Sequence, residues 1–188
     1  GDFKVDYTPV FGDAIDLQRF AELGKKGVLA LMCDSTNAER PGFTPSEKTV
    51  GKTFDSLFEE HKNTRIFVAT FASNVDRVQQ IINTAYKFGK KVCVEGRSMV
   101  SIIETARNLE CISIPDNTLI EIDQLKNYPD DQQVIITTGS QGESMAALSR
   151  MANGMHRKIT IGAGDTVIFS SNPIPGNEKS VTKVINEL

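Results

Sequence analysis

The chain has 188 residues, of which 39% are hydrophobic, with a formal net charge of −3 and an isoelectric point near 5.5. This length and apolar content suit one globular domain, or one domain with a short appendage. The negative charge excludes a strongly basic nucleic-acid-binding module, although it leaves room for a local positive patch.

The first predicted elements are a short helix over residues 16–23, stopped by Gly24, and a strand over residues 28–33. The second is a continuous apolar run, which is typical of a strand buried on both faces of a parallel sheet. A longer helix follows, with Thr44 as the predicted N-cap and Glu47 completing a capping box.

The central unit runs from Ile66 to Phe88 and is the pattern that the later chain repeats. Residues 66–70 predict a strand, and residues 71–74 predict a polar turn. A helix then follows, with apolar residues at helical spacing. We expect Ser73 to cap this helix, so that the free N–H groups of its first turn can hold an anion.

Strands are next predicted over residues 91–95, 134–138, 159–161 and 166–169. Helices are predicted over 99–109, 144–152 and from 177 onward, with a less regular stretch at 112–128. Strands that alternate with helices predict an α/β fold, a mostly parallel open sheet with helices on both faces, similar to a Rossmann fold.

Polar residues follow the predicted strands. In an open parallel sheet, ligands bind beyond the carboxyl ends of the strands. The ends expected at this edge are 34–37, 71–74, 96–98, 138–141 and 170–172. Serine, asparagine and glycine there can simply cap helices and make turns. Arg97 and Phe71 are not needed for that purpose, so we favour a site for phosphate oxygens with an aromatic face for a base.

Several motifs are absent from the sequence. It has neither a G-x-x-x-x-G-K-[ST] loop nor a G-x-G-x-x-G fingerprint, and no H-x-H-x-D-H run. Its two histidines, His61 and His156, are expected on the surface, so the chain alone cannot form a closed metal site. The three cysteines form no C-x-x-C pair, and we expect reduced thiols in a cytoplasmic protein.

Six segments together resemble the family of bacterial ribonucleases J, in the β-CASP branch of the metallo-β-lactamase superfamily. They are Gly1–Lys4, Cys33–Gly42, Ala69–Asn74, Gly96–Met99, Thr138–Glu143 and Ser170–Asn177. The resemblance runs from end to end. It implies that residues 1–27 are the edge of a metallo-β-lactamase domain and a connector, and that residues 28–188 are a β-CASP domain.

The resemblance implies that the full protein is a zinc-dependent ribonuclease, with 5′-to-3′ exonuclease and endonuclease activity in mRNA decay and rRNA maturation. Asp2 matches an aspartate that bridges two zinc ions, and Asp34 matches a carboxylate that helps orient the catalytic site. The residues that match the segment around the RNA 5′-monophosphate are Phe71, Ser73, Asn74 and Val75. The weaker candidates for contact with the RNA backbone are Arg97, Ser98, Ser140 and Gln141.

The expected partners are RNA, the protein's own metallo-β-lactamase domain and further copies of the full-length enzyme, but no membrane. The family's H-x-H-x-D-H ligands would lie before Gly1, and its later histidines after Leu188. The chain alone should therefore hold no zinc tightly and cleave no RNA. Asp76 stands where the family pattern has histidine or an aromatic residue, which adds negative charge near the phosphate site. The alternative is a self-standing α/β module that binds a nucleotide or phosphate in a regulatory role, without hydrolysis.

Overall fold

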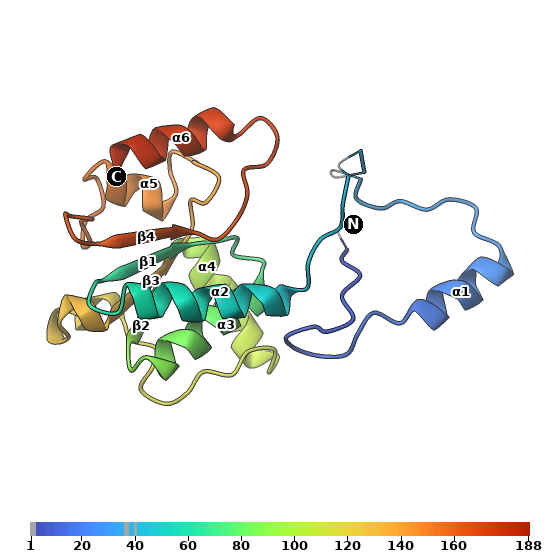
Figure 1. The fold of residues 1–188 in the computed structure, drawn as a ribbon, viewed down its shortest axis with the longest axis horizontal. Coiled ribbons are helices and arrows are strands. Elements are labelled where there is room, and N and C mark those ends of the chain that lie inside the picture. Colours follow the sequence, from blue (N-terminus) through green and yellow to red (C-terminus); the bar gives the residue numbers. More distant parts are fainter. Residues whose placement is uncertain (1–2, 36–37, 40) are drawn as a thin grey trace. The chain divides into compact units, whose positions relative to one another are not determined.

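The computed structural model describes residues 3–35, 38–39 and 41–188, and the chain divides into two compact units, residues 1–50 and 51–188. Figure 1 shows the elements of both units. Among the described residues, no helix combines the length and apolar content needed to cross a bilayer.

The first unit contains helix α1, Leu17–Lys26, whose N-cap Asp16 accepts a hydrogen bond from the Arg19 N–H at 2.9 Å. The helix continues through Gly24 and ends at Gly27, where the backbone φ is +90°. It is therefore longer than predicted. None of its residues is buried, so its apolar side chains lie on an exposed face.

The strand predicted over residues 28–33 is wrong. The segment is irregular, and its apolar side chains are exposed, with Leu29 and Met32 at 105% and 88%. A strand needs a neighbour to pair its backbone N–H and C=O groups, and no described residue of this unit supplies one.

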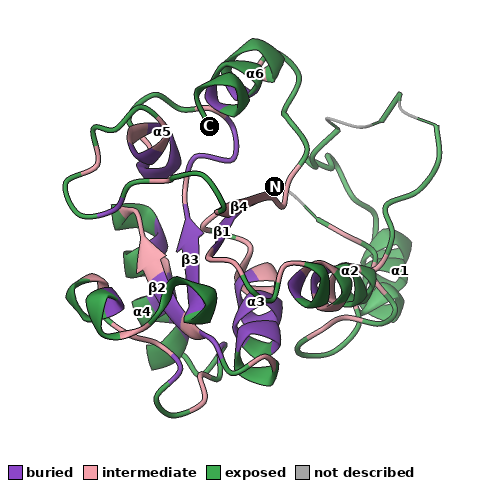
Figure 2. Ribbon diagram, turned by 60° about the vertical axis from the view of Figure 1, so that its left-hand side comes forward, coloured by how far each residue is buried: buried purple, intermediate pink, exposed green. Residues whose placement is uncertain are grey.

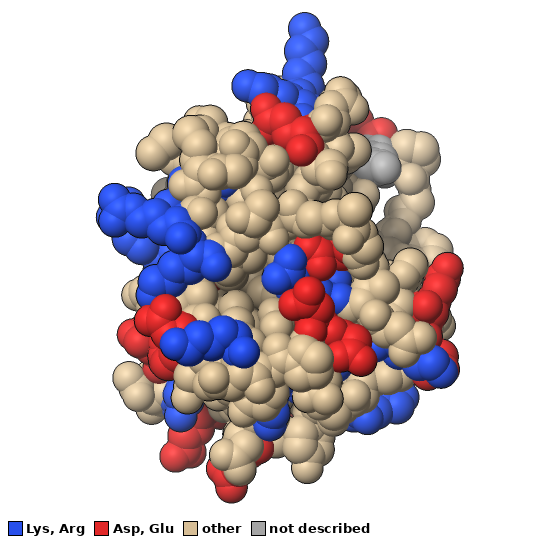
Figure 3. Space-filling model, turned by 90° about the vertical axis from the view of Figure 1, so that its left-hand side faces the viewer, with Lys and Arg blue, Asp and Glu red and all other residues tan. Residues whose placement is uncertain are grey.

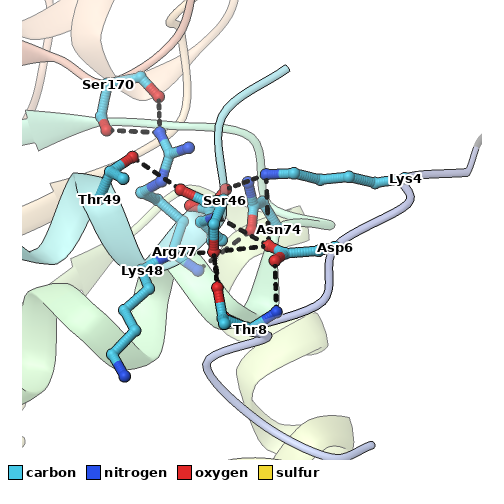
Figure 4. A network of polar contacts seen from close by, with 10 residues as sticks. Lys4, Asp6, Thr8, Ser46, Lys48, Thr49, Asn74, Arg77 and Ser170 are labelled. Carbon is cyan, nitrogen blue, oxygen red and sulfur yellow. Dashed lines mark hydrogen bonds and ion pairs between the residues drawn. The ribbon is translucent and has the colours of Figure 1, made fainter. Parts of the chain in front are cut away.

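Helix α2, Glu47–Glu60, begins later than the sequence predicted. Its N-cap is Ser46 rather than Thr44, since the Ser46 hydroxyl accepts from the Lys48 N–H at 3.3 Å. Asp6 also accepts from the Glu47 N–H at 2.9 Å (Figure 4). The N–H groups of Glu47 and Thr8 lower the pKa of Asp6 by bonding its charged form.

The second unit is built on four parallel strands: β1, Ile66–Ala69; β2, Lys91–Glu95; β3, Gln133–Thr137; and β4, Thr166–Phe169. They lie in the order β2-β3-β1-β4. This confirms the predicted α/β fold with an open parallel sheet. Residues 159–161 form no strand and instead contribute Ile159 to the core as irregular backbone.

Successive side chains of a strand point to opposite faces, and both faces of this sheet are covered. On one face Phe67 and Ile135 pack with α5, Ala147–Ala152, and with the 3-10 helix η1, Ile122–Asn127. The alternate strand residues Ile66, Val68, Val134 and Ile136 are also completely buried, on the opposite face. Figure 2 shows β3 buried along its whole length, with β2 only partly buried beside it.

Helix α3, Val75–Lys87, covers that opposite face and contacts β2 and β3. Helix α4, Arg97–Asn108, contacts α3 and β2. Helix α6, Glu178–Glu187, packs through Val184 against Leu148 of α5. The short 3-10 helix η2, Asp130–Gln132, leads into β3. The prediction of helices on both faces is thus confirmed.

Candidate functional site

All four strands are parallel, so their carboxyl ends lie at one edge of the sheet. Strands β1 and β3 are neighbours, but the helices that follow them, α3 and α5, cover opposite faces. This is a topological switch point, the place where ligands bind in open α/β sheets. Phe71–Asn74 and Thr138–Gln141 leave the sheet there.

The turn between β1 and α3 is closed by a hydrogen bond of 3.1 Å from the Asn74 N–H to the Phe71 carbonyl. Asn74, not Ser73, caps the helix, because its side-chain oxygen accepts from the Arg77 N–H at 3.0 Å (Figure 4). Ser73 is exposed, and in the described part of the chain its hydroxyl has no partner. Its hydroxyl is therefore free to meet a ligand, which a capping hydroxyl would not be.

Arg77 is a residue of this edge that the sequence analysis missed. It lies in the first turn of α3, and its Nη1 donates to the carbonyl and the hydroxyl of Ser170 at 2.6 and 2.8 Å (Figure 4). Ser170 directly follows β4. The guanidinium thereby joins two neighbouring strand ends and places a positive charge at the edge. Nothing in the local sequence reveals this contact, because its partners are 93 positions apart.

Thr70 is a second residue that the sequence analysis did not single out as a ligand group. It directly follows β1, is only 2% exposed, and its hydroxyl oxygen is buried without a hydrogen-bond partner among the described residues. An unpaired buried hydroxyl costs free energy, typically about 1–3 kcal/mol. An uncompensated polar group directly under the switch point is consistent with a site that a ligand completes.

Ser140 and Gln141 follow β3 and are 2% and 4% exposed. The Gln141 amide nitrogen donates to the Ser171 hydroxyl at 3.3 Å and to the Asn172 carbonyl at 3.0 Å. Its oxygen accepts from the Ile174 N–H at 2.7 Å and from the Asn177 amide at 3.4 Å. An amide side chain has two donor and two acceptor positions, so Gln141 has none left for a ligand.

Arg97 and Ser98 begin α4 and are exposed. The preceding Gly96 has a φ of +107°, and a Cβ at this position would lie 2.5 Å from the Thr138 hydroxyl oxygen. Glycine is therefore needed for the close approach of the β2 and β3 ends. Both exposed side chains remain free to face a ligand along the edge.

His156 is not the surface residue that the sequence predicted, since its side chain is 6% exposed. Its Nδ1 accepts from the Ile159 N–H at 3.1 Å, which leaves Nε2 to carry the proton of a neutral ring. Nε2 lies 3.4 Å from Glu95 at the end of β2. The ring thus braces the connection between α5 and β4 against the sheet.

The two acidic candidates lie in the first unit. Asp34 is exposed, and Asp2 is outside the described residues, so their roles stay predictions. Among the described residues, no three His, Cys, Asp or Glu side chains group as metal ligands. The described residues therefore do not by themselves fit a zinc centre.

The amino ends of the strands have a different character. Arg65, just before β1, pairs with Asp165, just before β4, at 2.6 Å. Figure 3 shows a face that is mostly uncharged and carries several groups of both positive and negative side chains. Paired charges of both signs make this edge a poorer site for an anion than the carboxyl edge.

Comparison with known proteins gives one family and a set of close relatives. Residues 63–188 match the model of the family described as "Ribonuclease J, beta-CASP domain". The whole chain is 54% identical to ribonuclease J 1 of Streptococcus pyogenes, of which it covers 33%, and 52% identical to ribonuclease J of Synechocystis, of which it covers 29%. It is 45% identical to ribonuclease J2 of Bacillus subtilis, covering 34% of that protein. The chain thus spans about a third of the length of these relatives.

Proposed function

This chain belongs to the ribonuclease J family through its β-CASP domain, and from that premise we propose that it is the RNA-binding portion of a zinc-dependent ribonuclease. The proposal includes 5′-to-3′ exonuclease and endonuclease activity of the full-length protein, in mRNA decay and rRNA maturation. It also includes the division into residues 1–27, an edge of the metallo-β-lactamase domain and connector, and residues 28–188, the β-CASP domain.

The observation that carries the proposal is the Ser73 hydroxyl, which does not cap α3 and lies beside the N-terminus of that helix at the switch point. The first-turn N–H groups of a helix attract phosphate oxygens. Ser73, the Asn74 amide group and the Val75 N–H would bind the 5′-monophosphate of RNA. Phe71, half-buried in the same turn, would lie beside the terminal nucleotide.

Arg97 and Ser98 would contact the RNA backbone from the neighbouring strand end, because both are exposed there. Ser140 is a weaker candidate for direct contact because it is buried, and Gln141, whose amide is completely hydrogen-bonded, would act on the RNA only through its neighbours. Asp34 would orient the catalytic site, and Asp2 would join zinc ligands outside this chain. Zinc, when bound in the full-length protein, would supply an activated water, but the residues described here hold no set of ligands from which to derive that step.

The remaining features of the proposal concern partners and location. The metallo-β-lactamase domain would be the intramolecular partner, and the full-length enzyme would form homo-oligomers in the cytoplasm. A self-standing module for a nucleotide or phosphate would bind the same anion at α3. The gene distinguishes the two proposed functions, since only the ribonuclease requires an H-x-H-x-D-H run encoded upstream of Gly1.

The test compares oligoribonucleotides with a 5′-monophosphate and a 5′-hydroxyl, by fluorescence anisotropy with the 188-residue chain. Ser73→Ala should weaken binding of the phosphorylated RNA about ten- to a hundredfold, the loss expected for one hydrogen bond to a charged group, and leave the 5′-hydroxyl RNA unchanged. Ser101→Ala, an exposed serine within α4, is the matched control and should change neither. Equal losses for both RNAs would contradict a 5′-phosphate site at Ser73.

A further inference from the structure

The segment between β4 and α6, residues 170–177, which we name the β4–α6 loop, is fixed by side chains from two different strand connections. It contains Pro173 and Pro175, and residues 172–176 are exposed. A loop of eight residues at a surface normally owes its conformation to few contacts. Here its position is determined from both sides of the switch point.

Arg77 holds the beginning of the loop. Its Nη1 donates to the carbonyl and the hydroxyl of Ser170 (Figure 4). The Ser170 N–H donates to the Ala69 carbonyl at 2.8 Å. Arg77 stands three residues after the helix cap Asn74. The turn proposed to bind the 5′-phosphate and the start of the loop are therefore joined by one side chain.

Gln141 holds the rest of the loop. Each of its four hydrogen-bonding positions is used by the loop, at Ser171, Asn172, Ile174 and Asn177. A side chain that is 4% exposed and completely bonded contributes position rather than ligand contact. Asn172 itself is exposed, and among the described residues its amide side chain has no partner.

We propose that the β4–α6 loop forms a third side of the RNA site, with the Asn172 amide bonding the ribose-phosphate next to the 5′ end. Arg77 and Gln141 are positioning residues that hold the loop for this contact. The inference rests on the proposed function, because it assigns a further contact to the same RNA. It separates Gln141, which acts through the loop, from the exposed residues that touch the ligand.

The experiment measures two quantities in the 188-residue chain: hydrogen exchange of the Ile174 amide, and affinity for RNA with either 5′ end. Gln141→Leu removes all four bonds, so Ile174 exchange should accelerate at least about tenfold, and affinity for both RNAs should fall about three- to tenfold. Gln141→Glu keeps the acceptor for Ile174 and should restore most of its protection. Gln132→Leu, an exposed glutamine of η2, should change neither quantity.

Asn172→Ala completes the test, since it removes the proposed contact with RNA and leaves the hydrogen bonds of Gln141 to the loop in place. RNA affinity should fall about three- to tenfold, with Ile174 exchange unchanged. The inference would be overturned if Gln141→Leu left the exchange rate of the Ile174 amide unchanged. It would also be overturned if this variant accelerated that exchange without changing the affinity for RNA. If the wild-type chain bound both RNAs equally and Asn172→Ala still lowered the affinity, only the proposed 5′-phosphate site would be overturned.

Discussion

Lys90 shows how much a single side chain can depend on the tertiary structure. In the sequence it follows Gly89 at a helix end, where a lysine is usually solvated. In the structure it is 3% exposed, and its ammonium group donates to the carbonyls of Lys62, at 2.8 Å, Thr64, at 3.2 Å, and Asp131. It therefore ties the connection from α2 to β1 to the segment before β3.

Burial lowers the pKa of Lys90, while the nearby Asp131 carboxylate acts in the opposite direction. Lys90→Met should lower the free energy of unfolding by about 1–3 kcal/mol, because three carbonyls lose their donor. The folded state releases the proton more readily than the unfolded chain. The free energy of unfolding of the wild type therefore rises with pH between the lowered pKa of Lys90 and the ordinary lysine pKa of about 10.4.

Urea denaturation at pH 7, and then at several higher pH values up to about 10, measures both the loss of stability and its pH dependence. Lys52→Met, at an exposed position of α2, is the control. The difference between wild type and Lys90→Met should widen with pH, while the control stays near wild type throughout. A difference that shrinks with rising pH would contradict the lowered pKa of Lys90.

At the scale of elements, two glycines with the same backbone conformation have different tasks. Gly89 has a φ of +68° and closes α3 in a Schellman motif, with hydrogen bonds from Gly89 to Tyr86 and from Lys90 to Ala85. Gly142 has a φ of +72°, but a Cβ there would lie 2.3 Å from the Ser180 backbone of α6. Gly142 is thus the point at which α6 touches the connection after β3.

Replacing each glycine by alanine separates strain from packing. Gly89→Ala should cost about 1–2 kcal/mol of unfolding free energy, since its Cβ meets nothing within 4 Å and only the left-handed conformation is penalised. Gly142→Ala should carry that cost plus about 1–3 kcal/mol, because the Cβ must push α6 away. Thermal and urea unfolding of both variants measure the difference, and equal losses would mean that α6 adapts freely.

The whole second unit is organised around one buried sheet, and Cys93 reports on it. Cys93 is 1% exposed within the cluster that joins the strands to α5, whereas Cys33 and Cys111 are exposed. Burial, with smaller effects of the Glu95 and Glu121 charges, raises the pKa of the Cys93 thiol to about 12. The thiolate is the reactive form, so this thiol should be inert in the folded protein.

Labelling with a disulfide reagent at pH 8 should therefore modify Cys33 and Cys111 rapidly, and Cys93 only at the rate at which the sheet opens. Cys33→Ser and Cys111→Ser variants identify the fast thiols by mass. In denaturant all three should react alike. Rapid reaction of Cys93 in native buffer would show that this layer opens readily in solution.

The sequence predicted most elements of the second unit, because apolar periodicity and turn residues act locally. Strand β2 begins and ends where predicted, and α3 ends at Lys87, two residues before the Gly89 expected to stop it. Caps were less predictable, since Ser73 and Asn74 are chemically similar and only the geometry of the turn chooses between them. The strand expected at residues 28–33 was wrong because pairing depends on a neighbour and not on the run itself.

The candidate site divides in the same way. Sequence alone placed polar residues after the strands, and with them Phe71, Ser73 and Arg97, since parallel strands must bring those ends to one edge. Only the tertiary structure decided that Gln141 is occupied by the β4–α6 loop and that Arg77 reaches Ser170. A hydrophobic pattern depends only on residues that are close in the sequence. A side-chain hydrogen bond such as these depends on atoms that folding brings together from distant parts of the chain.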